Sequence, residues 1–148
     1  MKIQIDQSSK IEYTSKNTVI AFANHKQKSL LIKATEKRKL QEAFRNVGKP
    51  NLFVLKTFAV LLYILVRDDL EKIDCLTIDI EYTGKDVLIK NLFLQVLRKD
   101  KKFIKDMDVR FLRIGKKSKA HEKAINTFQG KIKPDTIVKA EDCLRYIL

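Results

Sequence analysis

Two acidic residues, Asp79 and Glu81, lie two positions apart in the run LTIDIEYTGKD, residues 76–86. If this run is a β-strand, side-chain alternation places both carboxylates on one face, roughly 7 Å apart. Carboxylate oxygens bind magnesium or manganese, and such an ion can bridge them to a phosphate that the carboxylates alone would repel. The pair therefore indicates a metal-binding edge, although a solvated strand face is the simpler interpretation. The apolar residues of the run share the opposite face: Leu76, Ile78, Ile80 and Tyr82.

The net charge of the chain favours an anionic partner. Its 148 residues include 31 Lys and Arg against 18 Asp and Glu, a net charge of +13. Such an excess attracts polyanions at long range and gains free energy from counterion release, so nucleic acid is the first partner to consider and an anionic membrane surface the second. A lysine-rich, glycine-poor composition is also typical of thermophile surfaces. Charge therefore supports a nucleic-acid partner but does not establish it.

Size and composition favour a single globular domain over residues 1–148, because the chain is 45% hydrophobic and long enough for one core. Cys75 and Cys143 have no Cys or His at ligand spacing, which predicts buried free thiols in a reducing compartment. The longest apolar run, Leu52–Val66, contains Lys56 and is shorter than a membrane span, and the start MKIQIDQ has no apolar signal segment. We therefore expect a cytoplasmic protein with no membrane partner.

The first third of the chain predicts an antiparallel meander followed by a helix. Ile3 and Ile5 alternate with polar residues in a short strand that ends at Asp6, and two further strands are expected at Thr18–Ala23 and Ser29–Ala34. Apolar residues at intervals of three and four then predict an amphipathic helix over Glu36–Val47 with a mostly basic polar face.

Helices and strands alternate in the rest of the chain. The run Leu52–Val66 predicts a helix, capped by Asn51 and buried on most sides, and Ser118 is a suitable cap for a later helix. The helix over 87–97 is expected to turn Val87 and Leu88 inward. The other expected elements are a strand at Cys75–Tyr82, a helix at Val87–Leu97, a strand at Val109–Ile114, a helix at 119–128, a short strand at Thr136–Val138 and a closing helix at Glu141–Leu148.

This order predicts an α/β fold with a mixed sheet flanked by helices. It resembles the ribonuclease H-like superfamily: a first strand ending in a carboxylate (IDQSS), two hairpin strands, a long helix, and a fourth strand bearing acids (IDIEYTG). The resemblance covers nearly the whole chain. It implies a three-stranded antiparallel meander extended by parallel strands, with the fourth strand beside the first. Asp6 would then meet Asp79 and Glu81.

Two positions depart from the superfamily's pattern. Many members carry a Glu in the helix after the third strand, but Leu52–Val66 contains no acid and Glu42 lies in the earlier helix. The run IGKKSKAHEKAI is similar to the family's basic turn into its last helix, where the expected acid falls on Ile125. His121 and Glu122 are the available substitutes there, and Glu81 is a conjectural replacement for the missing Glu.

The resemblance and the acids together predict a metal-dependent nuclease that hydrolyses phosphodiester bonds. Asp6, Asp79 and Glu81 are the expected catalytic residues and ligands of Mg²⁺ or Mn²⁺. His121 is the fourth catalytic candidate, because an imidazole can orient water, carry a proton or bind a second metal near neutral pH. His121 also shares a helical stripe with Ile125 and Phe128, a pattern that is more typical of a half-buried structural histidine.

Basic residues cluster beside these candidates. Residues 98–123 hold eleven Lys or Arg and four Asp or Glu. We expect contacts to the backbone of DNA or RNA, because no ladder of aromatic residues interrupts the charges to stack on bases. A solvated basic surface is the alternative. The expected contact residues are Arg113, Lys116, Lys117, Lys119 and Lys123.

Two other functions fit the sequence. One is a non-catalytic nucleic-acid-binding module on a ribonuclease H-like fold, and the other is a basic interaction protein, as a homodimer or in a larger complex, with an apolar helix face packed on a partner. Separation of Asp6 from Asp79 would favour the interaction protein. Glycine-rich phosphate loops and a recognisable Ser/His/Asp motif are absent from the sequence, which argues against nucleotide-dependent or serine-hydrolase chemistry. The sequence assigns no role to Glu122 or Asp142.

Overall fold

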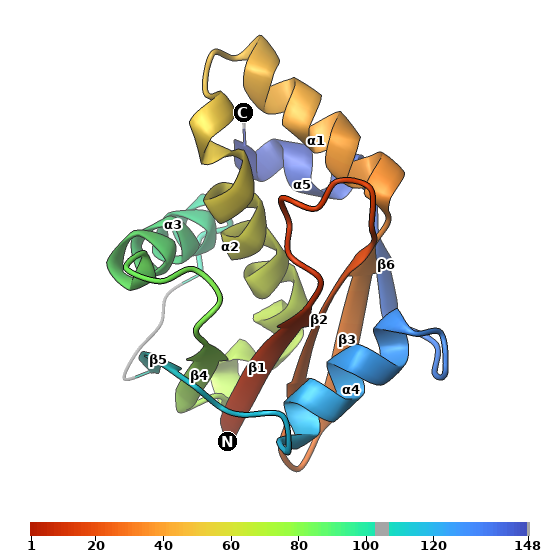
Figure 1. Cartoon of the computed structure of the whole chain (residues 1–148). Coiled ribbons are helices and arrows are strands. Elements are labelled where there is room, and N and C mark those ends of the chain that lie inside the picture. Colours follow the sequence, from red (N-terminus) through yellow and green to blue (C-terminus); the bar gives the residue numbers. More distant parts are fainter. Residues whose placement is uncertain (103–106, 148) are drawn as a thin grey trace.

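A six-stranded mixed sheet forms the centre of the computed structural model, which describes residues 1–102 and 107–147 (Figure 1). Leu148, the last residue of the expected closing helix, and Lys105, within the basic segment 98–123, lie outside the described residues. The strands follow the spatial order β5-β4-β1-β2-β3-β6. Their bounds are β1 Lys2–Ser8, β2 Thr18–Ala23, β3 Gln27–Ile32, β4 Cys75–Asp79, β5 Asp108–Leu112 and β6 Thr136–Val138.

The pairing of the strands combines an antiparallel meander with parallel additions on both sides. β1 pairs antiparallel with β2, and β2 with β3. β4 lies parallel to β1, β5 parallel to β4, and β6 parallel to β3. The prediction of an α/β fold with a ribonuclease H-like mixed sheet flanked by helices is therefore confirmed at the level of architecture.

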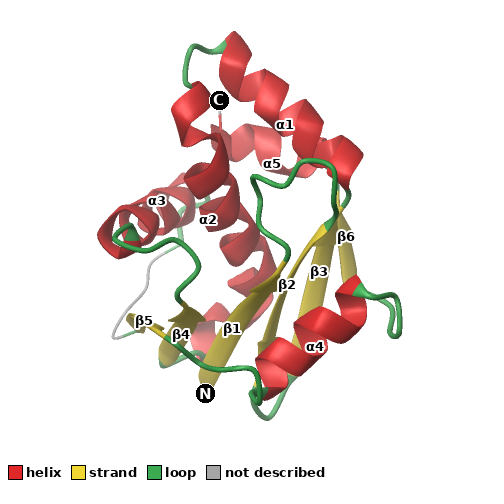
Figure 2. Ribbon diagram, in the orientation of Figure 1, coloured by secondary structure: helices red, strands yellow, loops and turns green. Residues whose placement is uncertain are grey.

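Helices cover the two faces of the sheet unequally (Figure 2). α4 packs on β1, β2 and β3 on one face of the sheet. On the other face, α2 packs on β2 and β3 within the main core, and α1, α3 and α5 pack against α2. Successive side chains of β2 point to opposite faces of the sheet, so β2 contributes to both layers. Ile20 and Phe22 belong to the main core, whereas Val19 and Ala21 form a small second cluster with Ala124 of α4. The helices are α1 Ala34–Asn46, α2 Phe53–Val66, α3 Asp86–Lys99, α4 Lys119–Phe128 and α5 Ala140–Ile147.

α2 is apolar around its whole circumference and is buried accordingly, as predicted. With the short 3₁₀ turns before and after it, it forms a helical stretch over Pro50–Lys72 that is long and apolar enough to cross a membrane. That stretch exceeds the apolar run seen in the sequence. However, 61% of its most apolar window is buried inside the protein. α2 is therefore the core helix of the fold, and Cys75 and Cys143 are buried free thiols, as expected.

Three predictions in the first half of the chain were wrong for local reasons. The third strand starts at Gln27 and ends at Ile32, because a tight turn after Ala23 places Gln27 directly opposite it. α1 consequently starts at Ala34, a residue assigned to the strand. Asn51 forms no cap, since Pro50 starts a 3₁₀ turn and the residue before α2 is Leu52.

The inward orientation predicted for Val87 and Leu88 was also wrong. These two side chains are 74% and 40% exposed. The buried stripe of α3 begins one residue later and follows helical spacing, so positions 87 and 88 fall off it. The stripe consists of Ile89, Leu92, Phe93, Val96 and Leu97.

A buried lysine attaches the β1–β2 connection to α1. Lys37 is fully buried, and its Nζ donates to the carbonyl oxygens of Lys10 (3.3 Å) and Tyr13 (2.8 Å) and to Thr18 Oγ1 (2.9 Å). Burial lowers the pKa of this ammonium to about 8. Lys37 thereby fixes the loop over residues 9–17, which borders the candidate site.

We predict that Lys37→Met destabilises the protein by about 2–4 kcal/mol, because the hydrogen bonds from the buried ammonium to Lys10, Tyr13 and Thr18 are lost. Between pH 8 and 10 the folded state holds fewer protons on Lys37 than the unfolded state, so this residue makes wild-type stability rise with pH. That contribution should be absent from the variant. Urea unfolding at several pH values measures both effects, and Lys39→Met, at an exposed position of the same helix, is the control. Equal destabilisation of the two variants would contradict the prediction.

Candidate metal site at the ends of two parallel strands

Three carboxylates converge where β1 and β4 run side by side. The parallel register pairs Ile5 with Ile78, so the next residues, Asp6 and Asp79, occupy neighbouring positions on one face. Ligand oxygens of Asp6, Asp79 and Glu81 all lie within 4.8 Å of one another. The first and fourth strands are thus neighbours, as predicted, and the separation that would favour an interaction protein is not found.

Glu81 reaches this cluster by a route that the sequence did not predict. β4 ends at Asp79 and not at Tyr82, so the expected spacing of about 7 Å along a strand does not apply. Tyr82 instead turns toward the 9–17 loop, where its hydroxyl accepts from Gln7 Nε2 and Ile11 N and donates to Glu12, each at 3.3 Å. The chain therefore bends after Asp79 and brings the Glu81 carboxylate back over the strand ends.

His121 joins the cluster from α4. The Ser118 hydroxyl accepts from the His121 N–H at 3.1 Å, so the predicted cap is confirmed and places His121 in the first turn. His121 Nδ1 lies 2.7 Å from Asp6 Oδ2, while Asp6 Oδ1 accepts from Gln7 N at 2.8 Å. The Asp6 side chain is only 4% exposed and that of His121 is 29% exposed. The imidazole therefore lies between a buried carboxylate and solvent.

The second strand acid is held by the connection between β5 and α4. Asp79 Oδ1 accepts the backbone N–H of Ile114 at 2.9 Å. The same connection supplies Arg113, Gly115 and Lys116 to the wall of the cavity that the acids line, about 320 Å³ in volume. Gly115 has φ +77°, a conformation that favours glycine and lets the connection turn toward α4.

Burial and mutual repulsion disfavour three negative charges in this cluster. Burial raises the pKa of Asp6. The pKa of Glu81 rises to about 8, first because it is desolvated and then because Asp6 and Asp79 are close, with Lys10 opposing the rise. A divalent cation would remove this repulsion, and hard oxygen ligands suit Mg²⁺ or Mn²⁺. The residues present therefore fit such an ion.

The predicted basic residues divide into two groups. Arg113 and Lys116 share the cavity with the acids, and Lys117 is exposed on the same connection. Lys119 is exposed at the start of α4 and lines two neighbouring hollows, one of them shared with Lys123. Lys123 also lies 3.6 Å from Asp135, so its charge is already partly balanced.

Other acids considered from the sequence lie elsewhere. Glu42 borders a groove between α1 and α5, and Glu122 lines the hollow beside Lys123. Asp142 accepts from the backbone N–H of Lys139 at 2.8 Å and so caps the start of α5. The site residues that sequence analysis missed are Gln7, which follows Asp6 on β1, and Lys10, which approaches the acids only after the 9–17 loop has folded onto Tyr82. No local sequence signal marks them.

Comparisons with known proteins do not assign the chain to a family. No protein-family model matches it, and no curated protein shows significant similarity to it. The geometry of the site and the resemblance in strand order are therefore the grounds for inferring function.

We predict that Mn²⁺ or Mg²⁺ raises the unfolding temperature of the wild-type protein in a concentration-dependent way. Binding to the folded state adds about 2.7 kcal/mol when the ion is at 100 times its Kd. Asp79→Asn and Glu81→Gln should lose most of this gain, because each removes one of three charged ligands. Thermal unfolding with EDTA and with added metal measures the difference, with Glu42→Gln as a control outside the cluster. Equal metal-induced shifts in all four proteins would exclude this site.

Proposed function

We propose that the protein is a metal-dependent nuclease that hydrolyses phosphodiester bonds in DNA or RNA on a ribonuclease H-like fold. The observation that carries the proposal is the convergence of Asp6, Asp79 and Glu81 within 4.8 Å at the ends of two neighbouring parallel strands. The strand order and the basic residues beside the acids support it.

The three carboxylates would hold Mg²⁺ or Mn²⁺. Bound there, such an ion supplies Lewis-acid polarisation of the phosphoryl group and lowers the pKa of an attacking water. Arg113 and Lys116 line the same cavity and offset the repulsion between the acids and an incoming phosphate. The site thereby combines ligands for a cation with fixed positive charge for the substrate.

His121 is positioned to move a proton. When Nδ1 carries the hydrogen of the 2.7 Å contact with Asp6, the ring is held in one orientation and Nε2 is the basic nitrogen. Among the described residues Nε2 has no hydrogen-bond partner, and the ring lines the cavity. Nε2 would accept a proton from the attacking water or return one to the leaving oxygen.

A non-catalytic nucleic-acid-binding or protein-interaction module on the same fold is the second candidate. The observation that favours it is the composition of the ligand set: α2 contributes no carboxylate, and α4 has Ile125 where the superfamily pattern has an acid. In that case the acids and His121 would be structural, and the basic residues would carry the function.

We assign the protein to the cytoplasm. The apolar helix α2 is used by the core, and both cysteines are buried as free thiols. A free-thiol state is typical of reducing compartments. No membrane partner is part of this proposal.

The purified protein should cleave at least one of four substrates, single-stranded, duplex, hybrid or branched, with Mg²⁺ or Mn²⁺. Asp79→Asn keeps the shape of the side chain but loses its charge, so we expect cleavage to fall at least about 100-fold while binding is retained. Initial cleavage rates and EDTA-supplemented binding assays measure the two effects. Glu42→Gln, purified in parallel, controls for contaminating nuclease. If no substrate is cleaved with either metal while binding persists, the non-catalytic module becomes the better description.

Nucleic-acid binding should depend on salt through the β5–α4 connection. Removing one lysine–phosphate interaction with duplex DNA reduces the slope of log K against log salt by about 0.9, so Lys116→Gln with Lys117→Gln should reduce it by about 1.8. Lys123→Gln should change the slope less, because Asp135 already pairs with that ammonium. Fluorescence anisotropy over a salt series gives the slopes. An unchanged slope in the double variant would remove this connection from the interface.

A further inference from the structure

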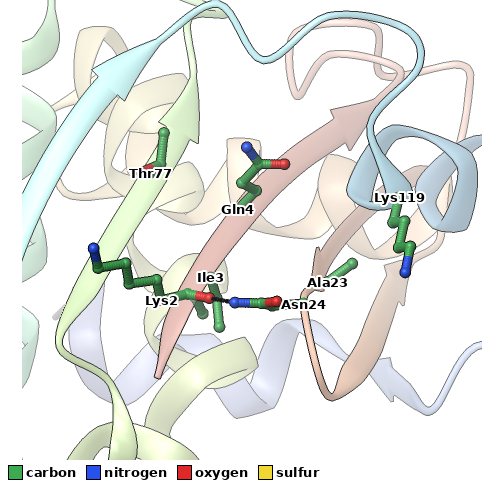
Figure 3. Close-up of a pocket in the computed structure, with 7 residues that line it drawn as sticks. All are labelled: Lys2, Ile3, Gln4, Ala23, Asn24, Thr77 and Lys119. Atoms are coloured by element: carbon green, nitrogen blue, oxygen red, sulfur yellow. Dashed lines mark hydrogen bonds between the residues drawn. The ribbon is translucent and has the colours of Figure 1, made fainter.

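A polar groove lies beside the acid cluster, between the start of α4 and the strands β1 and β4 (Figure 3). Its volume is about 410 Å³. Gln4 and Thr77 are direct partners in the β1–β4 register and form its floor, with Lys2 and Lys119 at opposite rims. The groove therefore belongs to the same face of the same two strands as Asp6 and Asp79.

This part of the sheet is open because α4 covers only the other half of that face. α4 packs on β1, β2 and β3, and among the described elements no helix lies over β4 and β5 on this side. The exposure of the strand residues agrees with this uncovered face. Lys2, Gln4 and Arg110 are exposed on it, whereas Ile3 and Ile5 point into the core on the opposite face. The sequence of β1 thus keeps one face polar and accessible.

The groove presents positive charge and unused hydrogen-bonding groups. Within residues 1–102 and 107–147, the side chains of Lys2, Gln4 and Lys119 make no hydrogen bond or ion pair. Asn24 donates to the carbonyl oxygen of Lys2 and so fixes the start of β1 beneath the groove. The lining contains no acid and no aromatic ring, which favours an anionic backbone over stacked bases.

The groove leads to the acids. Gln4 and Thr77 each precede an acid of the cluster by two residues, a step of roughly 7 Å along the strands. The connection that carries Arg113 and Lys116 follows β5 and crosses to α4 on the Gln4 side of the groove, away from Lys2 (Figure 3). A strand lying along the groove would therefore meet positive charge at both ends and reach the carboxylates.

We infer that this groove binds single-stranded DNA or RNA through its sugar–phosphate backbone and guides the strand to the acid cluster. The inference rests on the proposed nuclease function and extends it to the form of the substrate. A hollow of about 410 Å³ has the size of a small-ligand site, so it can receive part of one strand but cannot enclose a duplex.

The test compares two double variants that remove the same charge. Lys2→Gln with Lys119→Gln alters the groove, and Lys49→Gln with Lys90→Gln alters exposed lysines before α2 and on α3, away from it. The probes are a fluorescent single strand of about 12 nucleotides and a duplex of equal length, both in EDTA so that cleavage plays no part. The groove variant should bind the single strand at least fivefold more weakly, with a salt slope lower by about 1.4, or about 0.7 for each lysine–phosphate interaction removed. The control variant should stay within twofold of wild type at moderate salt.

A second measurement locates the strand directly. Lysine acetylation read by mass spectrometry should show Lys2 and Lys119 protected by the bound single strand and Lys49 unprotected. Single-strand binding by the groove variant equal to that of wild type or of the control would overturn the inference, as would equal weakening toward the duplex. Either result would leave metal-dependent cleavage at the acid cluster intact. A wild-type protein that binds neither probe and cleaves no substrate would instead remove the proposed function itself.

Discussion

The parallel pairing of β1 with β4 is the constraint on which the site depends. These strands are more than 65 residues apart in the chain, yet their register from Lys2 with Cys75 to Ile5 with Ile78 aligns two alternating patterns. Ile3, Ile5, Leu76 and Ile78 fill the core, so the polar partners must face outward. A slip of one residue would exchange the two faces and turn the acids into the apolar core. The register that packs the core is thus the same register that brings Asp6 beside Asp79.

The acidic cluster brings mutually repelling carboxylates together on a face of the sheet that helices cover only in part. Burial and repulsion raise the pKa of Asp6 and Glu81, a cost that the large apolar core around α2 can sustain. The cationic residues of the β5–α4 connection lie beside these acids and not around the molecule at random. Opposite charges that line one cavity suit a ligand that carries both phosphate and a counterion.

Local pattern predicted most of the fold, and long-range contacts decided the rest. Alternation in β1, the apolar run of α2 and the Ser118 cap are each properties of neighbouring residues, and these features were found. The early end of β4 was missed because Tyr82 leaves the strand to bond the 9–17 loop. The contact between His121 and Asp6 joins residues 115 positions apart, so no local spacing could reveal it.

Because helices cover the two faces of the sheet unequally, the acids and His121 are supported by apolar clusters of different size. α4 is attached through a small cluster, Val19, Ala21 and Ala124 with Leu31 and Phe128, whereas β1 and β4 belong to the main core. Regions with few buried apolar contacts open locally at lower free energy than the global fold. A transient detachment of α4 would withdraw the imidazole while the carboxylates stay in place. The three carboxylates and His121 are thus supported by two different apolar clusters, and His121 is attached through the smaller one.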